Sequence, residues 1–358
     1  MARYEVTWRE IAEGLRELGL ERGSTVLVHS SLSSFGYVVG GAEAVIKALV
    51  EVVGEEGTVV VPTLTGSIRD CPENPPVFSP DKPCWTGRIP ETLRRMPGAI
   101  RSLHPTHSVA ALGAGAEDLV RGHERCWTPC GEGSPYVKLA RGGGYILFLG
   151  VTLESNTTFH AAEELAQVRY HLQPEPVRCR IATPEGERTV ECMIHAYGTP
   201  RAFADLEDEL EREGILARGR IGRATVRLVR AGEMLDYTVK LLRGDELALV
   251  RRRSVDLWSL TEAIRIAGSE GATLRLLYYV PEGARVEVGG NRIRVSGVEL
   301  RGLGPYVVES LTLRLDASVE PIVLEGGALH WIRISGGKRV RVEVLETCLL
   351  YTSPSPRD

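Results

Sequence analysis

The start of the chain alternates between two patterns of apolar side chains. Residues 8–18 carry Trp, Ile and Leu at helical spacing, and TWRE (residues 7–10) is a capping box, so we expect a helix to begin there. The apolar run Thr25–His29 predicts a buried strand, which a helix over Ala42–Val53 and a second strand over Thr58–Val61 follow. The order strand, helix, strand is typical of a sheet that is covered by helices.

The same alternation returns further along the chain. The pattern predicts strands over Ser108–Leu112 and Tyr145–Gly150 and a helix over Thr158–Val168. Two runs, Arg178–Ile181 and Thr189–His195, flank the turn signal PEGER and predict a hairpin appended to the same sheet. The fold class that fits is α/β, with a mixed or parallel sheet covered by helices.

The pattern changes near residue 250. Before it, a charged amphipathic helix over Arg201–Gly214 and a strand over Gly222–Val229 complete a first domain, residues 1–250. After it, period-two alternation punctuated by glycine predicts a smaller all-β module over residues 254–347, either a sandwich or a small β-solenoid. Residues 348–358 have no pattern capable of packing and resemble translated adapter sequence, so we expect an unstructured tail that lies outside the fold.

Charge and hydropathy exclude two classes of partner. The net charge is −4, from 43 basic and 47 acidic residues, so the chain has no general attraction to nucleic acid. The acidic excess lies in residues 1–250, where it would favour a cationic substrate. No stretch reaches the roughly 18 apolar residues that cross a bilayer, and the N-terminus lacks the apolar core of a signal peptide. We expect a soluble, cytoplasmic protein that binds neither nucleic acid nor membrane.

The cysteines indicate a reducing compartment. The chain has seven, an odd number spread over its length, unlike the disulfide framework of a small secreted protein. Cys71, Cys84, Cys126 and Cys130 could supply a structural zinc ion or a disulfide, but the spacing of the first pair differs from the usual zinc pairing. Core or loop thiols are the simpler interpretation.

The first candidate site is the segment HSSLSSFGYVVGG, which begins at His29. In open α/β sheets, ligands bind beyond the carboxyl ends of the strands. The segment offers serine hydroxyls, and Gly41 opens a helix whose N–H groups could hold phosphate or the amide-rich arm of a cofactor. Because the segment has no Walker lysine and no G-x-G-x-x-G pattern, a turn that only connects strand to helix is an equal alternative.

The second candidate is a histidine and a carboxylate on one helical face. His160 and Glu163 are three residues apart, and Glu164 lies within reach. A carboxylate beside an imidazole fixes its tautomer and stabilises the imidazolium, as a general base requires; the alternative is an exposed surface pair. His104 and His107, in HPTHSV, could join His160 and Glu163 in the zinc site of a metallohydrolase. The more economical interpretation gives His107 a hydrogen-bonding task and needs no metal.

In order and spacing, residues 7–250 resemble the aminoglycoside N(3)-acetyltransferase family, through VHSSLSSFGYVVGGAEAVIKAL, TLTG, HPTHSVAALG, GEGSPYVKL and GVTLESNTTFHAAEELA. That family transfers an acetyl group from acetyl-coenzyme A to an amine of an aminoglycoside, on an α/β fold of its own. The resemblance implies that His160 is the general base and that Glu163 is its supporting acid or a contact for the substrate amine. It also implies that the pantetheine arm and phosphates are received by Ser30, Ser31, Ser34, Phe35, Gly36, His107 and Ser108.

Two acidic residues are candidates for the substrate side. Where the family has Asp six residues before the histidine, this chain has Glu154, whose extra methylene would change which amine is presented. Asp205 lies in an acidic run, residues 205–209, that could orient a polycationic sugar, although a solvated helix face is the simpler interpretation.

The expected function is therefore N-acetylation of a small cationic amine, with acetyl-coenzyme A as co-substrate and no metal. A zinc-dependent hydrolase and a non-catalytic coenzyme A-binding protein are the alternatives. The β module is not part of the family's usual unit, and we expect it to serve homo-oligomer contacts, a lid or stability.

Overall fold

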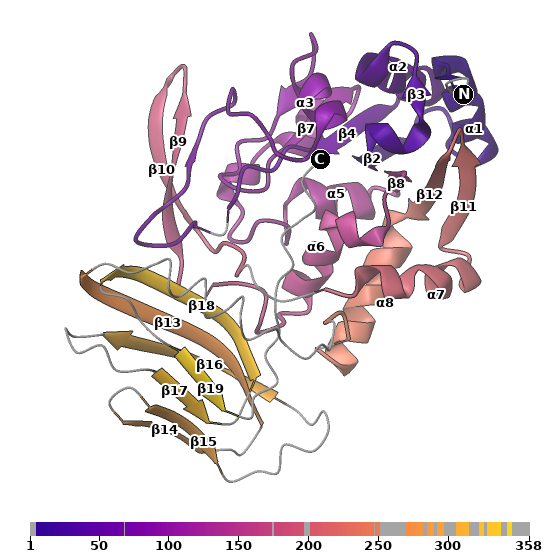
Figure 1. The fold of residues 1–358 in the computed structure, drawn as a ribbon. Coiled ribbons are helices and arrows are strands. Elements are labelled where there is room, and N and C mark those ends of the chain that lie inside the picture. Colours follow the sequence, from indigo (N-terminus) through magenta and orange to yellow (C-terminus); the bar gives the residue numbers. More distant parts are fainter. Residues whose placement is uncertain are drawn as a thin grey trace. The chain divides into compact units, whose positions relative to one another are not determined.

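The computed structural model describes residues 5–67, 69–173, 175–196, 201–246 and 248–250, together with the backbone of strands between residues 270 and 345 (Figure 1). The chain divides into two compact units. The first comprises Met1–Val168, Glu175–Ile194 and Ala202–Leu249, and the second comprises Arg169–Pro174, His195–Arg201 and Val250–Asp358.

A mixed seven-stranded sheet forms the centre of the first unit, in the order β11-β12-β8-β2-β4-β7-β6. Its strands are β2 (Thr25–Ser30), β4 (Thr58–Pro62), β6 (Ile100–Arg101), β7 (Val109–Gly113), β8 (Tyr145–Leu149), β11 (Leu216–Ile221) and β12 (Ala224–Arg230). Strand β2 pairs in parallel with both β4 and β8, and the outer strands pair antiparallel. The predicted α/β class with a mixed sheet is confirmed.

Helices cover this sheet (Figure 1). They are α1 (Trp8–Glu17), α2 (Gly41–Val53), α3 (Arg88–Arg94), α4 (Ala116–Val120), α5 (Pro135–Arg141), α6 (Thr157–Leu165), α7 (Glu207–Arg212) and α8 (Ala231–Gly244). Short 3-10 turns are η1 (Leu32–Phe35), η2 (His123–Arg125), η3 (Leu153–Ser155) and η4 (Phe203–Leu206). The predicted capping box is present, because the Thr7 hydroxyl accepts from the Glu10 N–H at 3.3 Å and the Glu10 carboxylate accepts from the Thr7 N–H at 2.7 Å.

The main core lies on one face of the sheet. Apolar side chains of α1, α2 and α3 pack there against alternate strand residues, among them Val26, Val28 and Val59. Leu27 and Phe148 are also buried and, by the alternation of a strand, point to the opposite face. There α5 and α8 contact the central strands. Burial on both faces explains why β2, β4 and β8 read as continuous apolar runs.

The predicted hairpin exists, but its place in the fold was predicted wrongly. Strands β9 (Val177–Thr183) and β10 (Gly186–Cys192) pair antiparallel, and β9 also pairs in parallel with β5 (Val77–Phe78) in a separate three-stranded sheet. Val177, Cys179, Cys192 and Ile194 form a small apolar cluster on this hairpin. A turn signal fixes local pairing only, whereas the neighbouring strand is chosen by tertiary packing.

Two other predicted elements differ from the structure. The single helix predicted over residues 201–214 is divided into η4 and the shorter α7. The strand predicted over residues 222–229 is one arm of the hairpin β11–β12, whose turn lies at Gly222 and Arg223. A small parallel pair, β1 (Glu5–Val6) with β3 (Tyr37–Val38), was not predicted.

In the second unit the described backbone between residues 270 and 345 consists of strands. They are β13 (Glu270–Pro281), β14 (Arg285–Gly289), β15 (Arg292–Ser296), β16 (Tyr306–Arg314), β17 (Ile322–Glu325), β18 (Ala328–Gly337) and β19 (Val342–Leu345). They form two sheets, in the orders β16-β13-β18 and β14-β15-β17-β19. An accessory all-β module and its tasks stay a prediction, and residues 348–358 lie outside the described residues.

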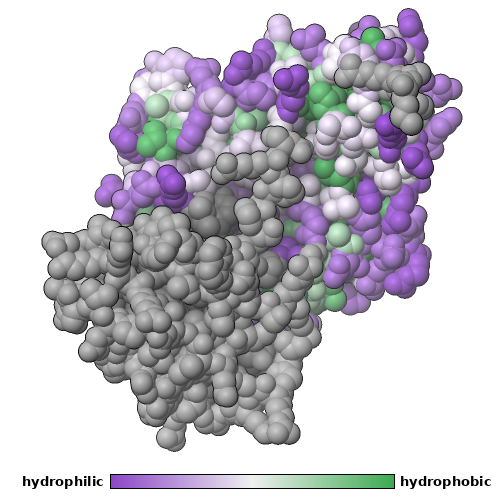
Figure 2. Space-filling view, viewed as in Figure 1, coloured by the Kyte–Doolittle hydropathy of each residue, from purple (hydrophilic) through white to green (hydrophobic). Residues whose placement is uncertain are grey.

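The surface of the first unit is mainly hydrophilic, with small apolar patches between charged side chains (Figure 2). Over the part of the chain that the structure describes, no helix combines the length and the hydropathy that a bilayer crossing requires.

We expect Gly113→Ala to destabilise the first unit more than Gly186→Ala. Both glycines have positive φ, +129° and +133°, so alanine is strained at either position. At Gly113 the new Cβ would also lie 2.1 Å from the Gly57 carbonyl oxygen, whereas at Gly186 no described residue other than its chain neighbours lies within 4 Å of it. Denaturant unfolding should show a loss of about 1 kcal/mol for Gly186→Ala and of at least about 3 kcal/mol for Gly113→Ala. Equal losses would contradict the backbone contact.

Candidate active site

The predicted His–Glu pair is present on helix α6. The helix begins at a cap in which the Asn156 side chain accepts from the Thr158 N–H at 3.0 Å. One turn later, His160 Nδ1 lies 2.7 Å from Glu163 Oε2. The Glu163 side chain is fully buried and that of His160 is 24% exposed, so the pair is not an exposed surface ion pair.

This contact determines how the imidazole can react. A carboxylate at Nδ1 favours the tautomer with its proton on Nδ1, which leaves the basic electron pair on Nε2. Phe203 contacts the His160 ring edge-on, with ring centroids 5.4 Å apart, and so restricts its rotation. The role of His160 as a base stays a prediction at this point.

A buried ion pair fixes the segment that leads into α6. Arg227 Nε lies 2.6 Å from Glu207 Oε2, and both side chains are about nine-tenths buried. The other Glu207 oxygen accepts from the Leu153 N–H at 2.9 Å, and Arg227 donates to the Val151 carbonyl at 3.1 Å. Glu207, a member of the acidic run, therefore has a structural task and does not offer its charge to a substrate.

Glu164, next to Glu163, binds the loop before α5. Its two oxygens accept from the Cys130 N–H at 2.9 and 3.1 Å. At Gly131 a Cβ would lie 2.9 Å from Glu164 Oε2, so the loop backbone approaches the carboxyl group closely. Burial, with a smaller contribution from the charge of Glu163, raises the pKa of Glu164 to about 8, although hydrogen bonds from Thr128 and the loop backbone oppose the rise.

His107, a predicted co-substrate contact, is buried and interacts electrostatically with His160. Its Nδ1 is 2.9 Å from the Thr106 hydroxyl, and its carbonyl accepts from the Tyr136 hydroxyl at 3.2 Å. Burial, and then the charge of His160, holds the pKa of His107 well below its ordinary value. His107 is therefore a neutral imidazole close to the candidate base.

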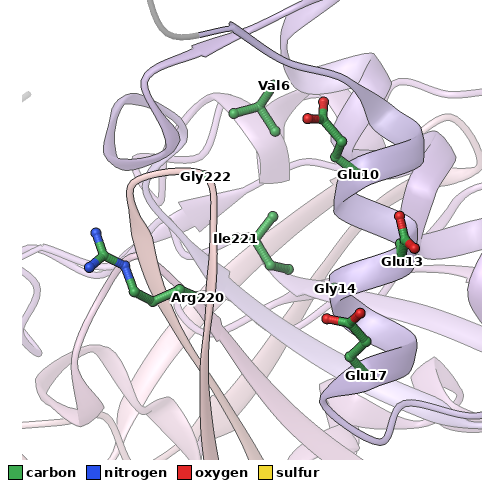
Figure 3. Close-up of a pocket in the computed structure, with 8 residues that line it drawn as sticks. All are labelled: Val6, Glu10, Glu13, Gly14, Glu17, Arg220, Ile221 and Gly222. Carbon is green, nitrogen blue, oxygen red and sulfur yellow. The ribbon is translucent and has the colours of Figure 1, made fainter.

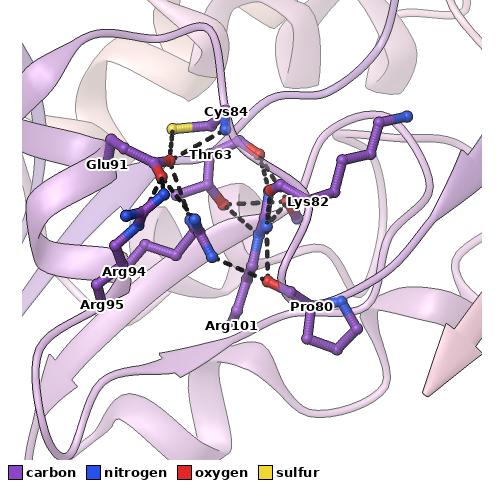
Figure 4. Close-up of polar contacts among 9 residues, drawn as sticks. Thr63, Pro80, Lys82, Cys84, Glu91, Arg94, Arg95 and Arg101 are labelled. Carbon is purple, nitrogen blue, oxygen red and sulfur yellow. Dashed lines mark hydrogen bonds and ion pairs between the residues drawn. The ribbon is translucent and has the colours of Figure 1, made fainter. Parts of the chain in front are cut away.

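Ser108, another predicted co-substrate contact, is engaged inside the protein. Its hydroxyl donates to the Thr63 carbonyl at 2.7 Å and accepts from Arg101 Nε at 3.1 Å. The Arg101 guanidinium also donates to the carbonyls of Pro80 and Lys82, at 2.8 and 2.5 Å, as Figure 4 shows. This network holds residues 80–82 against the sheet, so the Ser108 hydroxyl has a structural role here.

The donor set of the zinc alternative is not assembled. Among the described residues, no three of His104, His107, His160 and Glu163 bring ligand atoms within 4.8 Å of one another. His104 Nδ1 instead accepts from the His107 N–H at 3.1 Å. Cys71, Cys84, Cys126 and Cys130 are free thiols, and within the described ranges no three of them bring their sulfur atoms together as one ligand group.

The serine-rich loop lies where β2 and β8 end together. The Ser31 N–H donates to the Leu149 carbonyl at 2.9 Å, and the Ser34 hydroxyl donates to the Ser31 carbonyl at 2.6 Å. A Cβ at Gly150 would lie 1.6 Å from Ser34 Oγ, so the two strand ends meet at a glycine. The Ser30 hydroxyl is buried and finds no hydrogen-bond partner in the described part of the chain.

The other predicted members of this loop differ in exposure. Phe35 is fully buried in the main core, so its ring holds the loop in place. Gly36 follows with φ +96°, a conformation that favours glycine. The sequence did not single out His29, the residue before Ser30, although its position at the strand end was a signal.

The two substrate candidates are carboxylate side chains on neighbouring turns. Glu154 lies on η3 and Asp205 on η4, both are exposed, and these turns contact each other. Their role in binding an amine stays a prediction.

Two surface hollows lie near the core helices. A groove of about 780 Å³ beside α3 is lined by Glu43, Cys84, Gly87, Arg88, Glu91, Thr92, Arg95, Met96 and Pro97. A Cβ at Gly87 would lie 4.0 Å from the Ser30 carbonyl oxygen, so this lining residue is next to the start of the serine-rich loop. A smaller hollow of about 160 Å³ lies beside Glu10, Glu13 and Glu17 of α1 (Figure 3).

We expect Glu164 to make stability depend on pH. Because its pKa is raised from 4.5 to about 8, the folded chain binds more protons than the unfolded chain between these values. The free energy of unfolding therefore falls as pH rises through this window and levels off above it. Glu164→Gln should flatten the fall in Tm between about pH 5 and 8. Glu132→Gln, which removes an exposed carboxylate from the same loop, should keep the wild-type slope.

The family model for aminoglycoside 3-N-acetyltransferase matches residues 27–243. The aminoglycoside N(3)-acetyltransferase VII of Streptomyces paromomycinus is 36% identical over 268 residues, which cover 65% of this chain and 90% of that protein. A structure of AAC-IIIb with CoASH is similar with a TM-score of 0.59 and 31% identity, covering 67% of this chain and 97% of that one.

A structure of an AAC(3)-IVa variant in complex with a gentamicin is similar with a TM-score of 0.60 and 28% identity, covering 70% of this chain and 93% of that one. The matched residues include the serine-rich loop, the HPTHSV segment and helix α6. The chain belongs to the aminoglycoside 3-N-acetyltransferase family.

Proposed function

We propose that this protein transfers the acetyl group of acetyl-coenzyme A to an amine of an aminoglycoside, with His160 as the general base. The observation that carries this role is the 2.7 Å contact between His160 Nδ1 and the buried Glu163 carboxylate. The family supplies the reaction and the co-substrate, since a relative of this fold has been solved with CoASH and another with a gentamicin.

The chemistry follows from the proton that the amine must lose. The nitrogen electron pair attacks the thioester carbon while His160 Nε2 accepts a proton from the nitrogen. The buried Glu163 carboxylate stabilises the imidazolium that forms. When the carbon–sulfur bond breaks, the sulfur leaves with the bond's electron pair and takes the proton from His160. The products are an amide and the free thiol of coenzyme A, and the base returns to its starting state.

We infer that the pantetheine arm of acetyl-coenzyme A binds where strands β2 and β8 end together. Ser30, Ser31 and Ser34 lie on the loop there, Gly36 continues it, and Phe35 anchors it in the core. The uncharged imidazole of His107 lines the same binding site. Ser108 contributes by holding neighbouring backbone, because its hydroxyl is already bonded. Backbone N–H groups of such a loop can also stabilise negative charge on the thioester oxygen.

The acceptor is a cationic amino sugar. Glu154 and Asp205 are exposed carboxylates on adjacent turns, close in sequence to α6 and to Phe203 respectively. Paired acidic side chains at the mouth of a site attract polycations and lower their freedom to rotate. Glu154 in place of Asp would shift the amine by about one bond length.

Removing the base should abolish turnover and leave co-substrate binding intact. Thiol release with acetyl-coenzyme A and a panel of aminoglycosides should fall about 10²–10⁴-fold for His160→Ala, since general-base catalysis contributes this much. Glu163→Gln should lose part of that rate because the imidazolium is no longer opposed by a carboxylate. Calorimetry should show an unchanged Kd for coenzyme A in His160→Ala.

Two results would overturn this function. A wild-type protein that releases no thiol with any amine of the panel contradicts acetylation, and coenzyme A binding without turnover would favour the non-catalytic alternative. A His160→Ala variant that retains the wild-type rate contradicts the assignment of the base.

A further inference from the structure

His29 is a buried imidazole that the mechanism above does not use. It lies on β2 and is 4% exposed. Its ring is stacked on Phe148 of β8, with centroids 5.2 Å apart and planes 13° apart, so its orientation is fixed. His29 Nε2 is shielded from solvent and has no hydrogen-bond partner among the described residues. Buried polar atoms are normally paired, so an orphaned one at a ligand-binding edge points to a group that arrives with a ligand.

The ring is neutral and interacts electrostatically with the candidate base. Burial, and then the charge of His160, lowers the pKa of His29 to about 3. A neutral imidazole carries one N–H and one acceptor nitrogen, so it can donate a hydrogen bond at neutral pH but cannot serve as a base there. His29 is therefore suited to polarise a carbonyl group beside His160.

Ser30, the next residue, offers a second polar side chain at this strand end. The Ser30 hydroxyl is also buried and has no partner within the described ranges. The backbone after it is fixed, because the Ser31 N–H donates to the Leu149 carbonyl at 2.9 Å. Because successive strand residues point to opposite faces, the Ser30 hydroxyl lies at the same strand end as His29 Nε2 but on the other face of the sheet, and this end is at the edge where open α/β sheets bind ligands.

We propose that His29 donates a hydrogen bond from Nε2 to the acetyl carbonyl oxygen of acetyl-coenzyme A. This assignment rests on the proposed acetyl transfer and adds a second imidazole to it. When the amine attacks, the carbonyl electron pair moves to the oxygen, and the His29 N–H stabilises that oxyanion. The pair then reforms the carbonyl as the thiolate leaves with the proton held by His160. His29 keeps its own proton throughout.

Three substitutions of His29 distinguish the loss of its hydrogen-bond donor from the loss of its packing against Phe148. Glutamine can place an amide N–H near the position of Nε2, asparagine places its amide near Nδ1, and phenylalanine keeps a ring on Phe148 without any donor. We expect His29→Phe and His29→Asn to lower kcat for acetylation about 10²–10³-fold, the loss typical of one oxyanion donor. His29→Gln should recover most of the rate.

Two further measurements distinguish this role from a structural one. Calorimetry with coenzyme A, which lacks the acetyl group, should give the wild-type Kd for all three variants. The pH profile of kcat should keep its wild-type midpoint, because His29 neither takes up nor releases a proton in the proposed step. Thermal unfolding identifies any variant that does not fold, and the comparison of the asparagine and glutamine variants then carries the test.

Three outcomes overturn the proposal for His29. The first is a folded His29→Phe protein with the wild-type kcat. The second is a weaker affinity for coenzyme A with kcat unchanged, which would place His29 on the pantetheine arm. The third is a shifted pH midpoint, which would make His29 a titrating group. An inactive wild-type protein overturns acetylation itself, whereas an active one with unaffected variants overturns the role of His29 alone.

Discussion

A carboxylate that is shielded from water needs a partner, and in this protein the fully buried Glu163 side chain has one in His160. The contact holds the imidazole by Nδ1 and favours the tautomer whose acceptor electron pair is on Nε2. Phe203 restricts the ring from the side, and the Arg227–Glu207 pair fixes the chain that enters α6. The position of the His160 ring is therefore set by its own helix, through Glu163, and by neighbouring elements, through Phe203 and the Arg227–Glu207 pair.

The other histidines near His160 are placed in a different electrostatic environment. His29 and His107 are buried, and burial first and His160 second lower the pKa of each. An imidazole without a carboxylate partner in a dry environment stays neutral. His160 is the ring that combines a buried carboxylate with partial exposure. The fold thus gives its imidazoles different environments, and His29 and His107 are held neutral by burial and by the charge of His160.

Close backbone approach is the second device that shapes the site. Gly150 lets the loop after β8 lie against Ser34, and Gly131 lets the loop before α5 lie against Glu164. A side chain at either position would push the two segments apart. These glycines therefore fix the loop that follows β2 against the end of β8, and helix α6 against the loop before α5.

Local patterns in the sequence determined the elements that depend on neighbours along the chain. The capping box of α1, the apolar runs of β2, β4 and β8, and the spacing of His160 and Glu163 could all be read directly, because hydrogen bonds and periodicity within a few residues specify them. The order of several separated motifs indicated the family, which no single motif would have done.

Tertiary structure alone decided the contacts between distant segments. It placed the β9–β10 hairpin beside β5, engaged the Ser108 hydroxyl with Thr63, and paired Glu207 with Arg227 inside the protein. It also left the His29 Nε2 buried without a partner among the described residues. Burial and long-range pairing depend on which surfaces meet when the chain folds, and no window of sequence contains both partners.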